Sequence, residues 1–278
     1  MTRVFGLIGH PVARSLSPRM HAGWIAEAGL DAVYHAFEAA PDTSGARLVD
    51  AVRTLGLGGV NLTVPFKERV VPHLDGLGPV ARRTGAVNTI VARGQSLVGL
   101  NTDVPGFVAA LREHGVGLAG RTVVVLGAGG AARAAVVGAA EAGAARIVVL
   151  NRTERRARDL VDALWAQSPD TRIECGALDR FREIAHDADL VTVAVARSAD
   201  PTIGALDTSG VRADATWLDL NYGSNGLPQQ EALEARGVRF VDGLSMLIHQ
   251  GALAFGAFTG CTADPAVARR LLGGGIGA

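Results

Sequence analysis

Short runs of apolar, often β-branched residues alternate with helix-length segments from one end of the chain to the other. In the first hundred residues, the apolar runs predict strands at Val4–Ile8, Val33–Phe37, Val60–Leu62 and Val87–Val91. Between these runs, the pattern predicts helices at Pro18–Ala28, Thr43–Leu55 and Lys67–Leu74. Alternation of nearly continuous apolar strands with helices is typical of an α/β fold with parallel sheets covered on both faces.

A second series of the same kind begins after Asp103. Its predicted helices are Val104–His114, a segment starting at Ala131, and Glu154–Trp165, and its predicted strands are Thr122–Leu126, Arg146–Leu150, Leu190–Val195, Thr216–Leu220 and Val238–Val241. The last stretch, Leu244–Leu272, has a helical composition that is interrupted near Gly260 and Pro265. No long linker separates the two series, so we place a domain boundary near Thr102 from the positions of the motifs described below.

The segment Thr122–Leu150 consists mostly of Val, Ala, Gly and Leu, and a hydropathy scan could mistake it for a membrane span. Arg133, Glu141 and Arg146 interrupt it, and glycines cluster where a strand should turn. We therefore predict a buried strand, a turn, a helix and a second strand. The first residues, Met1–Gly9, resemble a strand and lack the features of a signal peptide, so we expect a soluble, cytoplasmic protein.

The composition favours a small-molecule partner. Hydrophobic residues make up 48% of the 278 residues, which is ample for a large core, and Lys plus Arg equals Asp plus Glu at 27 each. This balance provides no field that would attract nucleic acid or an anionic membrane. The two cysteines, Cys175 and Cys261, are far apart and suit a reducing compartment. Neither the cysteines nor the seven histidines have metal-ligand spacing, so we expect no metal.

A glycine-rich turn follows the predicted strand Thr122–Leu126 directly. It contains Gly127, Ala128, Gly129, Gly130 and Ala131, and a run of helix-forming alanines comes next. Glycines at such a strand-to-helix turn let a pyrophosphate approach the backbone, and the helix directs its amides and positive dipole end at the phosphate. A tight turn without a ligand is the less favoured alternative. The context predicts a dinucleotide-binding site.

The next strand end indicates which dinucleotide is bound. An NAD site usually has an Asp or Glu about 20 residues after the glycines, where it binds the ribose 2′-hydroxyl. This chain instead has Asn151, Arg152 and Thr153, with Arg155 and Arg156 just beyond. Guanidinium groups can bind a 2′-phosphate, and the dipole disfavours cations at a helix start unless an anion is present. NADP is therefore favoured over NAD.

Three polar groups in the first half could carry chemistry, although each has a structural alternative. Ser15 and Ser17 precede Pro18 at a predicted helix start, where capping is the commoner role and carboxylate binding the functional one. Lys67 ends the segment Asn61–Lys67 after a strand, and it could be a solvated lysine. Asn88 could cap a turn, and Asp103 could be the N-cap of the helix that begins at Val104.

Taken together, these segments resemble the shikimate dehydrogenase family along essentially the whole chain. The motifs that carry the resemblance are Ser15–Pro18, Asn61–Lys67, Gly85–Thr89, Asn101–Asp103 with Gly106, the glycine turn, Asn151–Thr153 and Asp242–Gln250. The resemblance implies two α/β domains facing across a cleft. Residues 1–102 and 244–278 would form the substrate-binding catalytic domain, and residues 103–243 the Rossmann-like NADP-binding domain.

The resemblance also implies the activity and the roles of individual residues. The expected reaction is the reversible, NADPH-dependent reduction of 3-dehydroshikimate to shikimate in the chorismate pathway of aromatic amino acid biosynthesis, by a monomer or homodimer. Lys67 and Asp103 would lie at the reacting hydroxyl, with Lys67 as proton donor and electrostatic anchor. Substrate would contact Ser15, Ser17, Asn61, Thr63, Asn88, Tyr222 and Gln250. Cofactor would contact Gly127, Ala128, Gly129, Gly130, Ala131, Asn151, Arg152, Thr153, Arg156 and the Gly243 backbone.

The chain departs from the family pattern in three places. The stretch 193–198 differs from the usual Asn-Ala-Thr-Ser pattern, the residues after Tyr222 lack the usual Thr-Pro-Leu, and Ser245 replaces a glycine. Related specificities are therefore alternatives: a quinate or aminoshikimate dehydrogenase on the same scaffold. A nicotinamide-nucleotide sensor without turnover is the alternative from another functional class, and the presence of Lys67 and Asp103 weighs against it.

Overall fold

The computed structural model describes residues 1–165, 170–196, 201–222 and 229–273. They form two compact units, Met1–Gly106 together with the residues from Leu247 onward, and Phe107–Met246. These limits lie a few residues after those expected from the motifs. Helices α4 (Asp103–Glu113) and α9 (Leu244–Thr259) each begin in one unit and end in the other. Each unit is built around its own six-stranded sheet.

The sheet of the first unit has the strand order β2-β1-β3-β5-β6-β4. The strands are β1 (Arg3–Gly9), β2 (Ala32–Glu38), β3 (Gly59–Leu62), β4 (Gly76–Leu77), β5 (Thr89–Arg93) and β6 (Ser96–Leu100). Strands β1, β2 and β3 are parallel, but β5 runs antiparallel to both β3 and β6. The expected parallel pairing is therefore present in this sheet except at β5.

The antiparallel pairing of β5 with β6 has a local cause. The register pairs Arg93 with Ser96, which leaves Gly94 and Gln95 as a two-residue hairpin loop. Gly94 has a φ of +62°, as the favoured two-residue hairpin turns require. A parallel return needs a crossover of a dozen residues or more, so this loop forces an antiparallel pair.

The mixed sheet gathers strand ends at one edge. Strands β1, β3 and β6 finish at the edge where the antiparallel β5 begins, because Asn61 pairs with Thr89 and Thr89 with Leu100. Residues that precede β5 therefore lie beside residues that follow β3 and β6. Polar side chains from four sequence segments can meet here.

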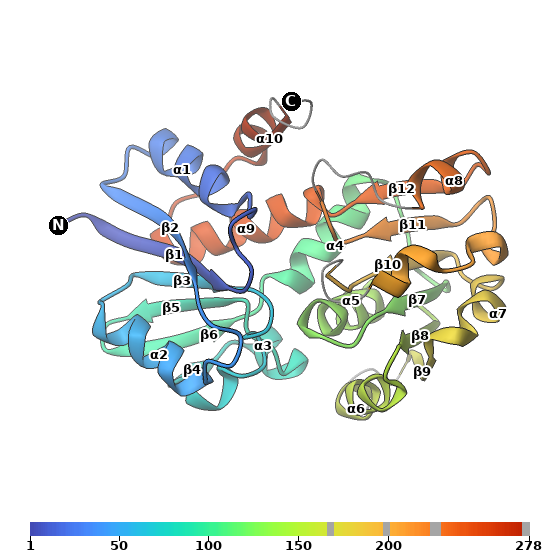
Figure 1. Cartoon of the computed structure of the whole chain (residues 1–278). Helices are drawn as coiled ribbons and strands as arrows, with labels where there is room; N and C mark the ends of the chain where they lie inside the picture. Colours follow the sequence, from blue (N-terminus) through green and yellow to red (C-terminus); the bar gives the residue numbers. More distant parts are fainter. Residues whose placement is uncertain (166–169, 197–200, 223–228, 274–278) are drawn as a thin grey trace. The chain divides into compact units, whose positions relative to one another are not determined.

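Helices cover both faces of this sheet (Figure 1). On one face, Leu48 and Val52 of α2 (Gly45–Thr54) pack against Ile8 and Val60. On the other face, Phe258 of α9 stacks on Phe5 of β1, with ring centroids 5.3 Å apart. The remaining helices of this unit are α1 (Ser17–Glu27), α3 (Pro79–Thr84) and α10 (Pro265–Gly273).

The prediction of a helix at Lys67–Leu74 is wrong. The chain makes turns there and only a short 3₁₀ segment, η1 (Val71–His73). Pro72 lies in this segment, where it lacks an N–H donor and disfavours the helical conformation of the residue before it. Lys67 therefore lies in a turn and not in an α-helix.

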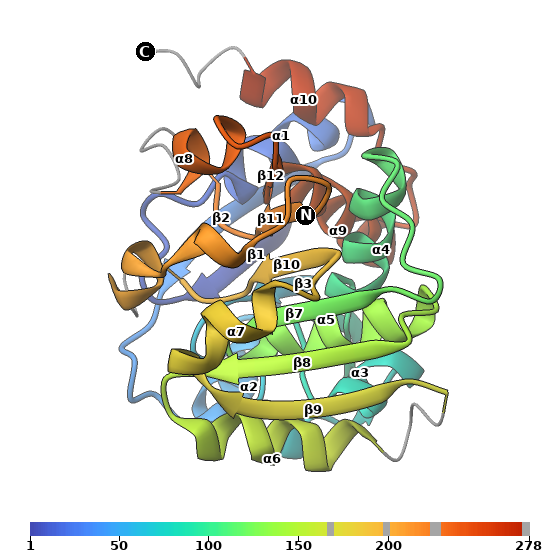
Figure 2. The ribbon, with the colours of Figure 1, turned by 90° about the vertical axis from the view of Figure 1, so that its right-hand side faces the viewer.

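The second unit has a wholly parallel sheet with the order β12-β11-β10-β7-β8-β9, part of which faces the viewer in Figure 2. Its strands are β7 (Thr122–Leu126), β8 (Arg146–Asn151), β9 (Arg172–Ala177), β10 (Leu190–Val193), β11 (Thr216–Asp219) and β12 (Arg239–Asp242). Strand β9 was not predicted. It is the outermost strand of the sheet and carries polar residues such as Arg172 and Glu174. It therefore lacks the continuous apolar pattern of a buried strand.

The helices of the second unit are the end of α4 with α5 (Gly130–Glu141), α6 (Glu154–Leu164), α7 (Phe181–Ala185), α8 (Gln230–Glu234) and the start of α9. Phe181 of α7 meets Trp217 of β11 edge to face, with centroids 5.9 Å apart, inside the main core of this unit. The apolar segment Thr122–Leu150 is β7, α5 and β8, as predicted. Among the described residues, no helix combines the length and apolar character needed to cross a membrane.

Candidate active site

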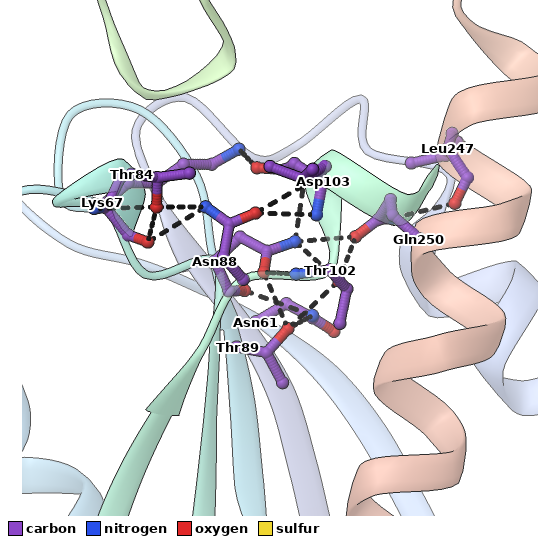
Figure 3. Close-up of polar contacts among 12 residues, drawn as sticks. Asn61, Lys67, Thr84, Asn88, Thr89, Thr102, Asp103, Leu247 and Gln250 are labelled. Atoms are coloured by element: carbon purple, nitrogen blue, oxygen red, sulfur yellow. Dashed lines mark hydrogen bonds and ion pairs between the residues drawn. The ribbon is translucent and has the colours of Figure 1, made fainter. Parts of the chain in front are cut away.

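Lys67 and Asp103 meet at the gathered strand ends of the first unit (Figure 3). The Lys67 Nζ donates to Asp103 Oδ2 at 2.7 Å, and the two side chains are 15% and 6% exposed. Lys67 lies in the turn after β3, and Asp103 is the first residue of α4. The expected convergence of these two side chains is thus present within a single unit.

Asn101, and not Asp103, caps the start of α4 with its side chain. Its Oδ1 accepts hydrogen bonds from the backbone N–H groups of Asp103, at 3.0 Å, and Val104, at 3.2 Å. The alternative in which Asp103 caps the helix is wrong. Because Asn101 satisfies these amides, the Asp103 carboxylate is left to bind other side chains.

Asn88 joins four parts of the site and does not cap a turn with its side chain. Its Oδ1 accepts from the backbone N–H of Thr102 at 2.7 Å and from the Thr89 hydroxyl at 3.1 Å. Its Nδ2 lies 2.9 Å from Asp103 Oδ1, 2.8 Å from Thr102 Oγ1 and 3.1 Å from Gln250 Oε1. Each oxygen of the Asp103 carboxylate therefore has a donor, Lys67 on one side and Asn88 on the other.

Gln250 reaches this network from α9, 162 residues away from Asn88 in the sequence. Gly106 of α4 allows the approach, because a Cβ there would lie 2.7 Å from Gln250 Cβ and 2.9 Å from its backbone nitrogen. The Gln250 Nε2 donates to Leu247 O at 2.8 Å, which leaves its oxygen facing Asn88. The glycine of the Asn101–Gly106 motif thus has a packing role.

Three further polar residues of the network were not predicted. Thr84 accepts from Asn101 Nδ2 at 3.2 Å, Thr89 accepts from Asn61 Nδ2 at 3.0 Å, and Thr102 accepts from Asn88. Each lies within or beside a motif that the sequence singled out. Their position within or beside those motifs could have identified them if the hairpin between β5 and β6 had been predicted.

A compositional signal for Lys67 was also available. Lys67 is the only lysine in the chain, and all the other residues in the Lys plus Arg total are arginines. Arginine cannot release a proton at physiological pH, whereas a lysine amine can exchange one. An otherwise arginine-based chain with one lysine, paired to a buried carboxylate, indicates chemistry that needs proton transfer.

Ser15, Ser17 and Thr63 follow strands that end at this same edge, β1 and β3. Ser15 Oγ accepts from the backbone N–H of Ser17 at 3.2 Å, so Ser15 does satisfy an amide at the start of α1. Ser17 is 6% exposed and Thr63 is partly buried. Together with Lys67, these residues bring hydroxyls and a cation to one sheet edge, a combination suited to a hydroxylated carboxylate.

The glycine turn of the second unit lies between β7 and α5. Gly127 has a φ of +118°, and a Cβ there would lie 2.9 Å from Ala194 O. Gly129 is the N-cap of α5 and makes no side-chain cap. A Cβ on Gly129 would meet no atom within 4 Å. The turn thus presents backbone amides and open space at a helix N-terminus, as anion binding requires.

The end of β8 has the expected basic character. Asn151 Nδ2 donates to Thr153 O at 2.9 Å, and Thr153 is the N-cap of α6. Arg152 and Arg156 are exposed beside it. Arg155 lies 4.0 Å from Asp159, a neighbour on the same helix. The position that would carry a carboxylate for a 2′-hydroxyl is occupied by the neutral Asn151.

Gly243 and Tyr222 lie near the carboxyl ends of β12 and β11. The Gly243 N–H donates to Asn221 O at 2.9 Å, and a Cβ there would lie 2.2 Å from Leu220 O, so only glycine fits. Tyr222 is partly buried. Of the three departures from the family pattern, Ser245 contacts His114 at 3.0 Å. Residues 197, 198 and 223–228 lie outside the described residues.

Family models for shikimate dehydrogenase match most of the chain. The substrate-binding domain model matches residues 7–90, the shikimate/quinate 5-dehydrogenase model residues 109–221, and the C-terminal domain model residues 243–272. A shikimate dehydrogenase (NADP(+)) of Symbiobacterium thermophilum is 41% identical over 260 residues, covering 91% of this chain and 87% of its own.

Solved structures agree with these matches. Shikimate 5-dehydrogenase of Thermus thermophilus, in complex with NADP(H) and shikimate, has a TM-score of 0.80 and 38% identity over 97% of this chain and 99% of its own. Quinate dehydrogenase of Corynebacterium glutamicum, in complex with NAD, has a TM-score of 0.87 and 29% identity over 98% and 99%. On its sequence, its fold and the geometry of its polar site, the chain belongs to the shikimate dehydrogenase family.

Proposed function

We propose that this protein catalyses the reversible, NADPH-dependent reduction of 3-dehydroshikimate to shikimate, a step of aromatic amino acid biosynthesis. The observation that carries the proposal is the Lys67–Asp103 ion pair inside a network of amide and hydroxyl groups. Relatives named as NADP(+)-dependent shikimate dehydrogenases support it. So does the binding of NADP(H) and shikimate by the Thermus protein.

The two units would divide the work. The first unit, close to the expected 1–102 and 244–278, is the substrate-binding catalytic domain. The second, close to 103–243, is the NADP-binding domain. Its parallel sheet supports this assignment, since ligands bind outside the carboxyl ends of such strands, where β7 and β10 are neighbours.

Substrate contacts follow from the chemistry available in the first unit. The hydroxyls of Ser15 and Ser17 would bind the substrate carboxylate. Asn61, Thr63, Asn88 and Gln250 supply amides and a hydroxyl for the ring alcohols, and Tyr222 of the second unit would complete the set. Asn88 Nδ2 has two hydrogens for three acceptors, so its contact with Gln250 is the one that a substrate hydroxyl can most readily replace.

Lys67 would provide the proton. NADPH, when bound, supplies the hydride that reaches the C3 carbonyl carbon of 3-dehydroshikimate. The carbonyl π electrons then move to oxygen, and the Lys67 ammonium stabilises the growing negative charge and transfers its proton to that oxygen. In the reverse direction the neutral amine removes the hydroxyl proton. Asp103 holds Lys67 at the reacting atom.

The cofactor contacts lie in the second unit. Gly127, Ala128, Gly129, Gly130 and Ala131 would bind the pyrophosphate, and the Gly243 backbone would lie near the nicotinamide. Asn151, Arg152, Thr153 and Arg156 would bind the adenosine 2′-phosphate. The neutral Asn151 and exposed arginines support NADP over NAD.

We further propose that the enzyme acts in the cytoplasm as a monomer or homodimer. Its free thiols, Cys175 and Cys261, suit a reducing compartment.

The strongest alternative is a quinate or aminoshikimate dehydrogenase, since a quinate dehydrogenase shares the fold. That relative was solved with NAD, and the absence of a carboxylate at Asn151 weighs against NAD here. A nucleotide sensor without turnover is a further alternative. It leaves the buried Lys67–Asp103 pair without a purpose.

Initial rates with shikimate and quinate, each with NADP and NAD, test the proposal. We expect the highest kcat/KM for shikimate with NADP. A higher value for quinate, or for NAD, would assign the alternative specificity. Binding of NADP without oxidation of either acid would support the sensor.

A further inference from the structure

A histidine and a tyrosine lie buried beneath the polar network of the first unit. His21 of α1 stacks on Tyr34 of β2 with ring centroids 4.0 Å apart and an angle of 5° between the planes. Trp24 meets the same imidazole edge to face, with centroids 5.2 Å apart. The exposed fraction is 1% for His21 and 8% for Tyr34. The cluster therefore fixes the plane of the Tyr34 ring by aromatic packing.

The imidazole contributes this packing without hydrogen bonds. Neither His21 nitrogen has a hydrogen-bond partner among the described residues. Burial lowers the pKa of His21 from 6.5 to about 3, so the ring is neutral at physiological pH. His21 thus packs against Tyr34 as a neutral aromatic ring.

The Tyr34 hydroxyl, in contrast, enters the polar network. It donates to Asn61 Oδ1 at 2.8 Å in a buried setting. Asn61 Nδ2 then donates to Thr89 Oγ1 at 3.0 Å and lies 3.3 Å from Asn88 O. If the Asn61 amide were flipped, its oxygen would face the backbone oxygen of Asn88, and two acceptors would meet. The contacts with Tyr34 and Asn88 therefore favour the orientation in which Asn61 Nδ2 points to Asn88 O.

The orientation of Asn61 has a consequence at Thr89. Because Thr89 Oγ1 accepts from Asn61, its own hydrogen can be given to Asn88 Oδ1, 3.1 Å away. Asn88 Oδ1 therefore acts as an acceptor, and Nδ2 faces the carboxylate oxygen Asp103 Oδ1 at 2.9 Å. Every donor from Tyr34 onward points toward Asp103, whose other oxygen binds Lys67.

We propose that Tyr34 is a positioning residue for the Lys67–Asp103 pair. It acts through Asn61, Thr89 and Asn88, while the neutral His21 ring holds it in place. The inference deepens the proposed function and rests on it. The hydrogen bonds that link Tyr34 to Asp103 run through these three residues, so its contribution is the fixed polarity of the hydrogen bonds that reach the carboxylate.

Kinetics of Tyr34→Phe test the inference, with His21→Phe as the matched control. Tyr34→Phe removes one hydroxyl and keeps the ring, whereas His21→Phe changes the stacked ring and leaves the hydroxyl. We expect kcat for shikimate oxidation to fall about five- to tenfold in Tyr34→Phe, as for a lost buried hydrogen bond. His21→Phe should stay within about twofold of the parent, and KM for NADP should be unchanged in both.

The single lysine supplies a second readout that does not need turnover. In protein labelled with ¹⁵N-lysine, one side-chain ¹⁵N resonance reports the environment of Lys67 alone. We expect its chemical shift to change in Tyr34→Phe, because the carboxylate that accepts from the ammonium is held less firmly. The chemical shift should stay unchanged in His21→Phe.

Two results would overturn the inference: parent-like kcat and a parent-like Lys67 resonance in Tyr34→Phe, or equal losses in both variants, which would indicate packing alone. If Tyr34→Phe does not fold, as judged by its melting temperature, Thr89→Val breaks the next hydrogen bond and is expected to give the same kcat loss and the same change in the Lys67 resonance. A parent that does not oxidise shikimate refutes the proposed function, while the Lys67 resonance still tests the role of Tyr34.

Discussion

At the scale of single residues, the site depends on which polar group forms a hydrogen bond with which neighbour. Asp103 begins α4 but does not cap it, because Asn101 accepts from the first amides of the helix. The carboxylate is left with Lys67 and Asn88 as donors, at an exposure of 6%. A buried ion pair is a weak source of stability, since desolvation offsets much of the attraction. Its retention here therefore points to function.

Removal of the Lys67 ammonium should abolish proton transfer. We expect Lys67→Met to lower kcat about 10²- to 10⁴-fold, the usual contribution of general acid–base catalysis. Lys67→Arg should be similarly impaired, because a guanidinium keeps the charge and cannot supply the proton. Steady-state rates measure both, with NADP binding as the control for folding. Turnover of Lys67→Met within a few-fold of the parent would remove Lys67 from the mechanism.

His21 should make the stability of the protein depend on pH. Its pKa is lowered from 6.5 to about 3 by burial. Between these values the unfolded chain binds a proton at His21 that the folded chain does not. The free energy of unfolding should therefore fall as the pH falls from about 6.5 toward 3, by at most about 1.4 kcal/mol per pH unit.

Urea unfolding of the parent and of His21→Phe at several pH values measures this effect. The variant lacks the titrating ring, so its stability should decline less steeply over the same range. Equal slopes for both proteins would mean that the folded state admits a protonated His21.

At the scale of secondary-structure elements, turns decide where polar residues gather. The two-residue hairpin at Gly94 makes β5 and β6 antiparallel, so Asn88 lies at the same edge as the end of β6. Because β5 is also antiparallel to β3, the end of β3 lies at this edge too. A parallel β5 would have carried Asn88 to the opposite edge. In the second unit, Gly127 has a positive φ, which lets the chain turn sharply from β7 into α5.

The two glycines of that turn should respond differently to alanine. Gly127→Ala places a Cβ 2.9 Å from Ala194 O at a φ of +118°, so we expect a lower melting temperature. Gly129→Ala meets no atom within 4 Å, so its stability should stay near that of the parent. Its methyl group should instead hinder the pyrophosphate and raise KM for NADP.

Thermal melts and NADP titrations of the two variants separate these effects. A stable Gly129→Ala variant that binds NADP as tightly as the parent would refute the assignment of this turn to the pyrophosphate.

At the scale of the whole molecule, two units each contain a complete sheet and core. The catalytic pair and its network belong to one unit, and the glycine turn and arginines belong to the other. Helices α4 and α9 are shared, and they carry Asp103 and Gln250 respectively. The two helices that connect the units therefore also carry residues of the candidate site.

NADP should stabilise the protein measurably more than NAD does. A ligand at about 100 times its Kd adds about 2.7 kcal/mol to the free energy of unfolding, on the order of 5 °C in melting temperature. We expect this gain with NADP, a smaller one with NAD, and a loss of the difference in Arg152→Ala. Differential scanning fluorimetry across cofactor concentrations measures all three. Equal shifts from NAD and NADP in the parent would refute 2′-phosphate recognition.

Local patterns in the sequence determined much of this protein. Apolar runs located β1, β2, β7 and β8, and glycines after β7 located the dinucleotide turn, because strand burial and sharp turns restrict residue types at adjacent positions. The motifs also indicated Lys67, Asn88 and Asp103. The polar strand β9 and the short helices α7 and α8 escaped prediction, since edge strands and single turns carry little periodic signal.

How those residues are used depends on tertiary contacts that no local pattern contains. The central position of Asn88 and the place of Tyr34 below the site depend on contacts between segments as far apart as β2, β3 and β5. Sequence periodicity records which face of an element is buried, but it does not record which polar atom meets which. That choice depends on sheet register and strand direction, and the two-residue hairpin sets both for β5 and β6.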